Sequence, residues 1–255
     1  MTFLQSVFLA VIQGLTEFLP VSSSGHLVFF QKILGIVQPP VFFDILLHLG
    51  TLGAIVVFFR KEIRDLLFHW QRQLKTWLFL FLGSIPATLA GFFFNSKIEL
   101  FFNSLWLVGI AWVIFGSWLL LTSKLTKGKK TRSMTWKDSL FIGIFQALAL
   151  LPGISRSGST ISAGLIRQQP RESAFRFSFL LAIPAILGAT VLEMKEVGLK
   201  EAFSPVAFLS MLIAGVVGYL TLVLLQKALR SEKFYLFGFY CLAIGTLALL
   251  LAFNL

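Results

Sequence analysis

The sequence has few charged residues and almost no cysteine. Only 13% of its 255 residues are Asp, Glu, Lys or Arg, about half the roughly 25% of an ordinary soluble domain. A single cysteine, Cys241, excludes a disulfide-stabilised scaffold. Hydrophobic residues make up 57%, with 29 Phe, which is too apolar for a disordered chain and more than a soluble chain of this size can bury. These shortages exclude a soluble enzyme and indicate one integral membrane domain over residues 1–255.

Acidic residues are scarcer than basic ones. The chain has 11 Asp and Glu against 22 Lys and Arg, which gives a net charge of +11. In a soluble protein this balance would suggest nucleic acid as a partner. No soluble segment here is long enough to form a binding domain, so we expect no nucleic-acid partner. Basic residues of membrane proteins gather in cytoplasmic loops, and we interpret the charge as a marker of topology.

Six apolar runs are long enough to cross a bilayer. Four carry no charged residue, one contains Asp44 alone, and one continues back through Arg176. The runs are 41–59, 76–96, 100–123, 177–192, 202–226 and 234–255. The sequence therefore predicts an all-α polytopic membrane protein with six full transmembrane helices.

Two further apolar segments, 2–35 and 139–167, are each interrupted by Pro, Gly and Ser, at 19–25 and at 151–158. Each half is too short to span. Pro and Gly break helices, and Ser caps a helix that restarts. We predict two re-entrant helical hairpins, because irregular backbone is tolerated at membrane depth only where it lines a cavity within the protein.

The two broken segments are related by a shift of 133 residues. The shift pairs Gln13 with Gln146, Ser22 with Ser155, Ser24 with Ser157 and Gly25 with Gly158. These shared positions cluster at the helix breaks, which favours a true relation over chance similarity between apolar sequences. We infer two repeats, 1–125 and 136–255, the first with hairpin 2–35 and the second with hairpin 139–167.

Charge placement fixes the orientation of the repeats. If the span at 41–59 runs from outside to inside, sixteen Lys and Arg lie on the inner side and four on the outer side, in agreement with the positive-inside rule. The first hairpin then enters from outside and the second from the cytoplasm. Opposite entry is typical of inverted-topology repeats, whose broken tips meet near the midplane of the membrane.

Glu17 and Arg156 are isolated charges in apolar runs, each beside a helix break. A lone charge in hydrocarbon costs on the order of 3 kcal/mol by insertion scales, and such residues mark functional sites by default. If the tips meet, the two side chains can pair and share a wet cavity. A purely structural ion pair is the alternative.

Hydroxyl residues surround both charges. Ser22, Ser23, Ser24 and His26 follow Glu17, and Ser155, Ser157, Ser159 and Thr160 flank Arg156. Helix capping explains at least one serine in each hairpin but does not explain an arginine between two of them. A Gly, Ser and Arg loop that leads into a helix offers amides, hydroxyls and a guanidinium at one point, which suits a phosphate group.

Asp44 and His48 are weaker candidates. They stand four residues apart in one predicted span and would share a helix face. They can pair with each other or face the cavity, and functional and structural roles are evenly balanced for them.

Two motifs resemble those of a known family. Residues 13–23, Gln-Gly-Leu-Thr-Glu-Phe-Leu-Pro-Val-Ser-Ser, resemble the (Glu/Gln)-x-x-x-Glu motif of the bacitracin-resistance family of undecaprenyl-diphosphate phosphatases. Residues 152–160 resemble that family's Pro-Gly-x-Ser-Arg-Ser-x-x-Thr motif, and His26 falls where the family carries a histidine. The resemblance extends over essentially the whole chain. Gln13 stands where many members have Glu, which weakens a metal role at that position.

The resemblance implies a multi-pass enzyme of the bacterial inner (plasma) membrane that converts undecaprenyl diphosphate to undecaprenyl phosphate and inorganic phosphate. This recycles the lipid carrier for cell-wall synthesis and confers bacitracin resistance. A site accessible from the periplasm and a dependence on Mg²⁺ or Ca²⁺ are further implications, with Gln13 and Glu17 as candidate metal ligands. The expected partners are the polyprenyl diphosphate lipid and the bilayer, with a homodimer left open.

From these features we expect Glu17, Ser23, His26 and Arg156 to be catalytic. We expect Ser155, Ser157 and Thr160 to bind phosphate together with Arg156. Ser23 is the favoured nucleophile and His26 its rival, while Glu17 or His26 acts as base and leaving-group acid.

Two other classes of protein stay open. Inverted repeats with broken helices are typical of transporters, so the chain could flip a polyprenyl phosphate, alone or in addition to hydrolysis. An intramembrane serine protease is less favoured, because proteases need no buried arginine beside the serine and their dyad spacing is absent.

Overall fold

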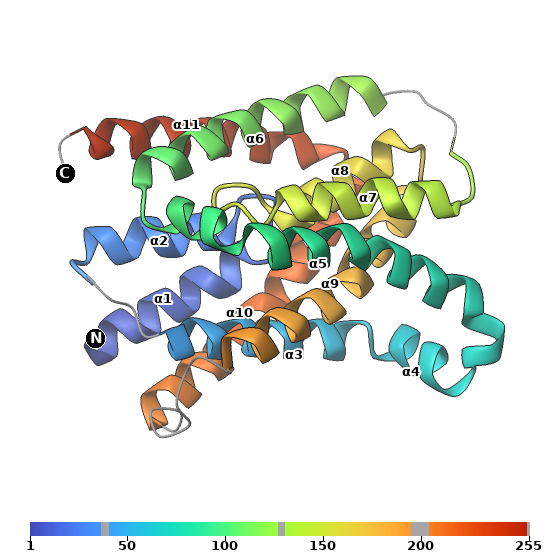
Figure 1. Ribbon diagram of the computed structural model, residues 1–255, viewed down its shortest axis with the longest axis horizontal. Helices are drawn as coiled ribbons and strands as arrows, with labels where there is room; N and C mark the ends of the chain where they lie inside the picture. Colours follow the sequence, from blue (N-terminus) through green and yellow to red (C-terminus); the bar gives the residue numbers. More distant parts are fainter. Residues whose placement is uncertain (37–40, 127–130, 195–203, 254–255) are drawn as a thin grey trace.

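The computed structural model describes residues 1–36, 41–126, 131–194 and 204–253, and all regular structure in these ranges is helical (Figure 1). Short 3-10 turns lie at Trp70–Gln73 and Lys233–Tyr235. The helices are α1 (Phe3–Thr16), α2 (Ser23–Ile33), α3 (Val41–Phe58), α4 (Arg60–Phe68), α5 (Leu74–Phe102), α6 (Leu105–Thr126), α7 (Trp136–Leu148), α8 (Arg156–Ile166), α9 (Arg171–Met194), α10 (Pro205–Arg230) and α11 (Leu236–Ala252). The all-α prediction is confirmed.

Five segments of the described chain are long and apolar enough to cross a membrane, namely those of α5, α6, α9, α10 and α11. A sixth is reached when α3 and α4, which are bent by 76° at their junction, count as one span. The five segments lie at five of the six predicted spans, and the bent pair begins at the sixth, 41–59. The helix bounds differ from the apolar windows: α5 covers 74–102 where the sequence predicts 76–96, whereas α11 covers 236–252 within the predicted 234–255.

The outer surface of the bundle is apolar. On α5, Phe92 and Phe93 are 79% and 68% exposed, far more than a soluble protein shows for consecutive aromatic rings. Along one edge of the bundle α6 and α11 lie side by side (Figure 1), and Trp112, Phe115 and Leu119 of α6 are buried. This distribution suits a bundle whose exterior contacts lipid.

The two broken segments have the same caps, 133 residues apart. Thr2 and Thr135 each form a capping box with the residue three positions on, Gln5 and Asp138. After the breaks, the N-cap hydroxyl of Ser22 accepts from Gly25 N at 3.3 Å, and that of Ser155 accepts from Gly158 N at 3.2 Å. The predicted pattern of helix, break and helix is therefore confirmed in both segments.

The second broken segment begins earlier than its apolar run suggests. Helix α7 starts at Trp136, not at 139, because the capping box of Thr135 and Asp138 holds its first turn. The Asp138 carboxylate is buried and paired with Arg132 at 2.7 Å and Arg167 at 2.5 Å. These two ion pairs connect both ends of the hairpin.

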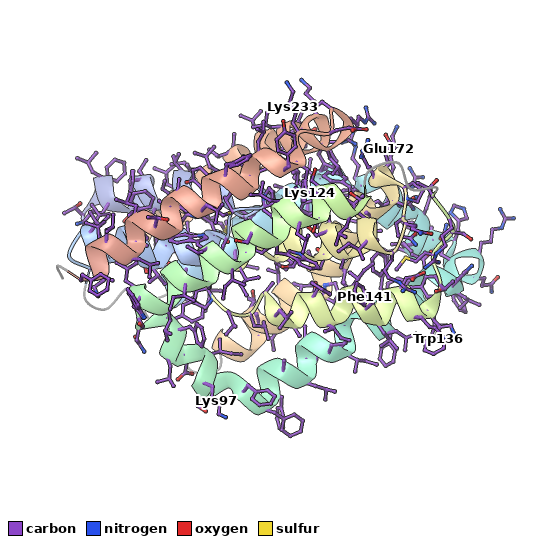
Figure 2. The ribbon with its side chains drawn as sticks, turned by 90° about the horizontal axis from the view of Figure 1, so that it is seen from above. Lys97, Lys124, Trp136, Phe141, Glu172 and Lys233 are labelled. Atoms are coloured by element: carbon purple, nitrogen blue, oxygen red, sulfur yellow. The ribbon has the colours of Figure 1, made fainter. Side chains whose placement is uncertain are left out.

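The hairpins start at opposite ends of the molecule. Helix α1 begins near the N-terminus on one side, and α7 begins on the other side, with the broken segments between them (Figure 1). Figure 2 shows Trp136 at one end of the bundle and Lys97 of α5 toward the other. Some lysines used in the charge count lie outside the described residues: Lys127, Lys129, Lys130, Lys195 and Lys200.

Close contact between α3 and α10 depends on a glycine. A Cβ at Gly50 would overlap the backbone carbonyl of Met211, whereas a Cβ at Gly53 would meet nothing within 4 Å. We expect Gly50→Ala to lower the free energy of unfolding by about 1–3 kcal/mol, because the helices must separate. Gly53→Ala is the matched control and should unfold at or slightly above the wild-type temperature. Thermal unfolding in detergent measures both; equal midpoints would contradict this view of the contact.

Candidate active site

The two broken segments hold each other through their backbone. Leu19, Pro20 and Val21 lie outside any helix, and apart from the bond from Val21 N to Leu19 O at 2.7 Å their carbonyl oxygens accept from other parts of the protein. The donors are Ser155 Oγ (3.2 Å) and Ser157 Oγ (3.3 Å) to Leu19, Cys241 Sγ (3.4 Å) to Pro20, and Trp112 Nε1 (2.8 Å) to Val21. The first break is thus satisfied by the second hairpin, α6 and α11.

Small residues let the tips come this close. The Ser22 hydroxyl, on a residue with φ of 68°, accepts from Gly153 N of the other tip at 3.0 Å. A Cβ at Gly25 would lie 2.8 Å from the Trp112 ring and 3.0 Å from Gly153 N. A Cβ at Gly158 would lie 2.8 Å from Pro20 Cβ. Gly25 and Gly158 are therefore required by the close contact of the two hairpin tips with each other and with α6.

Glu17 lies at the centre of this contact and is only 7% exposed. Its Oε1 accepts from Arg156 Nη2 at 2.8 Å, and its Oε2 accepts from Ser23 Oγ at 2.5 Å and from Gln13 Nε2 at 3.1 Å. The predicted pair of Glu17 and Arg156 is present. The arrangement places a serine hydroxyl directly on a buried carboxylate, which is the geometry of a nucleophile and its base.

Arg156 occupies the first position of α8, where its side chain is 14% exposed. While Nη2 is bonded to Glu17, Nη1 is buried and has no hydrogen-bond partner among the described residues. An unpaired buried guanidinium N–H is costly. The atom is therefore suited to an acceptor that arrives with a ligand, such as a phosphate oxygen.

Gln13 has a second unpaired atom. Its amide nitrogen donates to Glu17, and its Oε1 is buried without a partner. Oε1 and the Glu17 carboxylate fit a divalent cation that also takes oxygens from a phosphate and water, as Mg²⁺ commonly does. No group of three His, Cys, Asp or Glu suited to a metal occurs within the described residues.

The other hydroxyls of the second motif are used inside the protein. Ser155 and Ser157 are 3.1 Å apart through their Oγ atoms, and both contact Leu19 O. The Thr160 hydroxyl donates to Arg156 O at 2.8 Å and lies 2.6 Å from Ser178 Oγ. All three predicted phosphate ligands are buried, and they fix the segment that carries Arg156.

His26 lies apart from the Glu17 network. Its Nδ1 bonds to Ser22 O at 2.7 Å, which makes Nδ1 the donor. Its Nε2 then accepts from Tyr240 Oη at 2.7 Å, and the two rings are stacked. Sequence reasoning did not find Tyr240, because the contact joins residues 214 positions apart. In this geometry both ring nitrogens are already occupied.

His48, whose role the sequence left evenly balanced, lies beside the Glu17 carboxylate. Its Nε2 lies 3.7 Å from Glu17 Oε2. Its Nδ1 bonds to the Asp44 backbone carbonyl at 2.8 Å, while Gln31 donates to the Asp44 carboxylate. Asp44 and His48 are in contact, as expected, but the His48 ring bonds to the Asp44 backbone carbonyl and not to its carboxylate. The other side of the ring faces Glu17.

Fold and site together define a class: a helical membrane protein with a hydroxyl, a carboxylate and a partly unpaired guanidinium buried where two broken helical hairpins meet. Such a group can bind an anionic headgroup and transfer part of it.

Comparison with known proteins gives the family. The family model described as "Bacitracin resistance protein BacA" matches residues 6–247, and the chain belongs to that family. A relative from Desulforapulum autotrophicum is 42% identical over 270 residues and covers 98% of each chain. A relative from Carboxydothermus hydrogenoformans is 41% identical over 253 residues, covering 97% of this chain and 96% of its own. Both are named undecaprenyl-diphosphatase.

Proposed function

We propose that this chain hydrolyses undecaprenyl diphosphate to undecaprenyl phosphate and inorganic phosphate. The single observation that carries the proposal is the Ser23 hydroxyl on the buried Glu17 carboxylate at 2.5 Å, beside a guanidinium with an unpaired N–H. Full-length similarity to relatives named for this activity supports the choice of substrate. Because those relatives carry the name of a hydrolase, hydrolysis is favoured over lipid transport and over proteolysis.

The first step uses Ser23 and Glu17. Ser23 Oγ forms a bond to the terminal phosphorus while the bond from that phosphorus to the bridging oxygen breaks. The electron pair leaves with undecaprenyl phosphate, and the hydroxyl proton passes to Glu17 Oε2, which already accepts that hydrogen bond. Because the base already contacts the nucleophile, the carboxylate need not move toward the hydroxyl during the reaction.

The second step restores the serine. A water oxygen forms a bond to the phosphorus as the bond to Ser23 Oγ breaks. Glu17 gives its proton to Ser23 Oγ and takes one from the water, and inorganic phosphate leaves. Glu17 thus serves as base in the first step and as both acid and base in the second.

Arg156 binds the diphosphate through Nη1 while Nη2 holds Glu17, so one guanidinium orients the base and neutralises the transferred group. Ser155, Ser157 and Thr160 position the segment that carries it. His26, whose nitrogens are occupied, holds the Ser22 turn before Ser23. A divalent cation held by Gln13 and Glu17 would supply further positive charge to the diphosphate.

We also propose that the chain consists of two inverted repeats, 1–125 and 136–255, with re-entrant hairpins that enter from opposite faces of the inner membrane. The matched caps support this, as does the packing: α1 packs on α10, and α7 on α5. The predicted charge asymmetry puts the first hairpin outside, which gives the site access from the periplasm.

Phosphate release tests the function. Purified protein in detergent is expected to release inorganic phosphate from undecaprenyl diphosphate and leave the monophosphate lipid.

A chelator should slow the reaction, and added Mg²⁺ or Ca²⁺ should restore it; an unchanged rate would remove the cation from the proposal. Lipid translocation in vesicles without phosphate release would contradict hydrolysis and favour the transporter.

A further inference from the structure

His48 contacts Glu17 from outside the two hairpins. The other side chains that contact the Glu17 carboxylate come from α1 and from the first turns of α2 and α8, and all belong to the broken segments. His48 belongs to α3, a long helix that packs against α10 through Gly50. It therefore ties the carboxylate to a part of the bundle that does not take part in the hairpin contact.

The ring orientation of His48 is fixed. Nδ1 donates to the Asp44 carbonyl oxygen at 2.8 Å, one turn earlier on α3. This bond turns the opposite nitrogen, Nε2, toward Glu17 Oε2, 3.7 Å away. Oε2 is the same carboxylate oxygen that accepts from Ser23. Because Nδ1 already donates to a carbonyl, Nε2 attracts this oxygen only in the doubly protonated imidazolium, and that is the form assigned to His48. The contact thus acts on the atom of Glu17 that touches the nucleophile.

Substrate binding makes this contact necessary. In the structure Arg156 is the nearest counter-charge of Glu17, at 2.8 Å. A diphosphate on Arg156 Nη1 competes for the guanidinium and brings negative charge toward the carboxylate, which repels it. With its hold on Oε1 weakened, Glu17 would rotate away from Ser23 unless Oε2 is held separately.

We propose that His48 is a positioning residue that holds Glu17 Oε2 against the Ser23 hydroxyl while Arg156 binds the diphosphate. The inference rests on the proposed phosphatase activity and adds a member to its site. His48 acts through Glu17 and does not contact the substrate. Its loss therefore affects the chemical step and leaves diphosphate binding by Arg156 in place.

The test compares His48→Leu, which removes the contact, with His48→Gln, which keeps an N–H donor on a shorter arm. We expect His48→Leu to lower kcat for phosphate release by about 10- to 100-fold, the size expected of a misplaced catalytic group, with KM nearly unchanged. His48→Gln should recover most of the rate. His69→Leu is the matched control, because His69 is exposed and paired only with Asp65 in the described structure.

A double variant shows whether His48 acts through Glu17. In a Glu17→Gln background, His48→Leu should cause no further loss of the residual rate, because the group that it positions is gone. Wild-type kcat in a folded His48→Leu protein would overturn the proposal, as would an equal additional loss in the Glu17→Gln background or failure of a folded His48→Gln to recover activity. Absence of phosphate release from the wild type would instead overturn the phosphatase function itself.

Discussion

Replacing Arg156 with alanine is expected to lower kcat/KM for phosphate release by about 1000-fold, the upper end for loss of one charged transition-state donor. Two effects combine. The variant loses the unpaired Nη1 that we assign to the diphosphate, and Glu17 loses the guanidinium 2.8 Å from its Oε1. Phosphate release from undecaprenyl diphosphate under single-turnover conditions measures the loss.

Stability must be measured beside activity, because Arg156→Ala leaves a carboxylate buried without its main partner. Breaking a buried pair in this way costs about 3–5 kcal/mol in soluble proteins. Arg156→Lys is the informative second variant: it restores a cation for Glu17 but cannot contact carboxylate and phosphate with two coplanar N–H groups. Arg171→Ala, which removes an exposed pair with Glu232, is the control for charge. A folded Arg156→Ala protein with wild-type turnover would exclude the phosphate role.

Charges within apolar runs located the site from sequence alone. Glu17 and Arg156 stood out because hydrocarbon disfavours an unpaired ion, and the structure brings them to 2.8 Å. The helix breaks were predictable for a similar reason, since Pro, Gly and Ser act locally on the backbone. Both predictions depend on properties of a residue and its immediate neighbours.

The support of the site could not be predicted in the same way. Trp112 and Cys241 bond to carbonyl oxygens 91 and 221 residues away, and such pairs have no local pattern. The role of His48 was undecided because a histidine on an apolar helix can face either neighbour, and only packing decides.

The two hairpins contribute different chemistry at matched positions. The shift of 133 residues pairs Ser23 with Arg156 and Glu17 with Leu150. One repeat thus supplies the carboxylate and the hydroxyl, and the other supplies the cation. In the proposed mechanism neither half carries the full set of groups, so activity requires the contact between the tips, where Ser155 and Ser157 donate to Leu19 O.

Replacing Ser23 tests most directly whether the first hairpin supplies the nucleophile. Ser23→Ala is expected to lower turnover at least about 1000-fold, because loss of an activated nucleophile leaves only the rate supported by binding and electrostatic stabilisation. Ser24→Ala is the matched control: its hydroxyl lies 3.3 Å from that of Ser22, and no contact with Glu17 is found in the described structure. Its turnover should stay within a few-fold of wild type.

Trapping the intermediate separates the remaining alternatives. Rapid acid quench of wild-type protein with lipid labelled in the terminal phosphate should leave acid-stable label on Ser23, and Ser23→Ala should carry none. Acid-labile label on His26 would show the rival nucleophile at work, although Ser22 and Tyr240 occupy both its ring nitrogens. Turnover without any label, together with an active Ser23→Ala protein, would mean that water attacks directly. Glu17 would then deprotonate that water, and the hydrogen bond from Ser23 would serve only to orient the carboxylate.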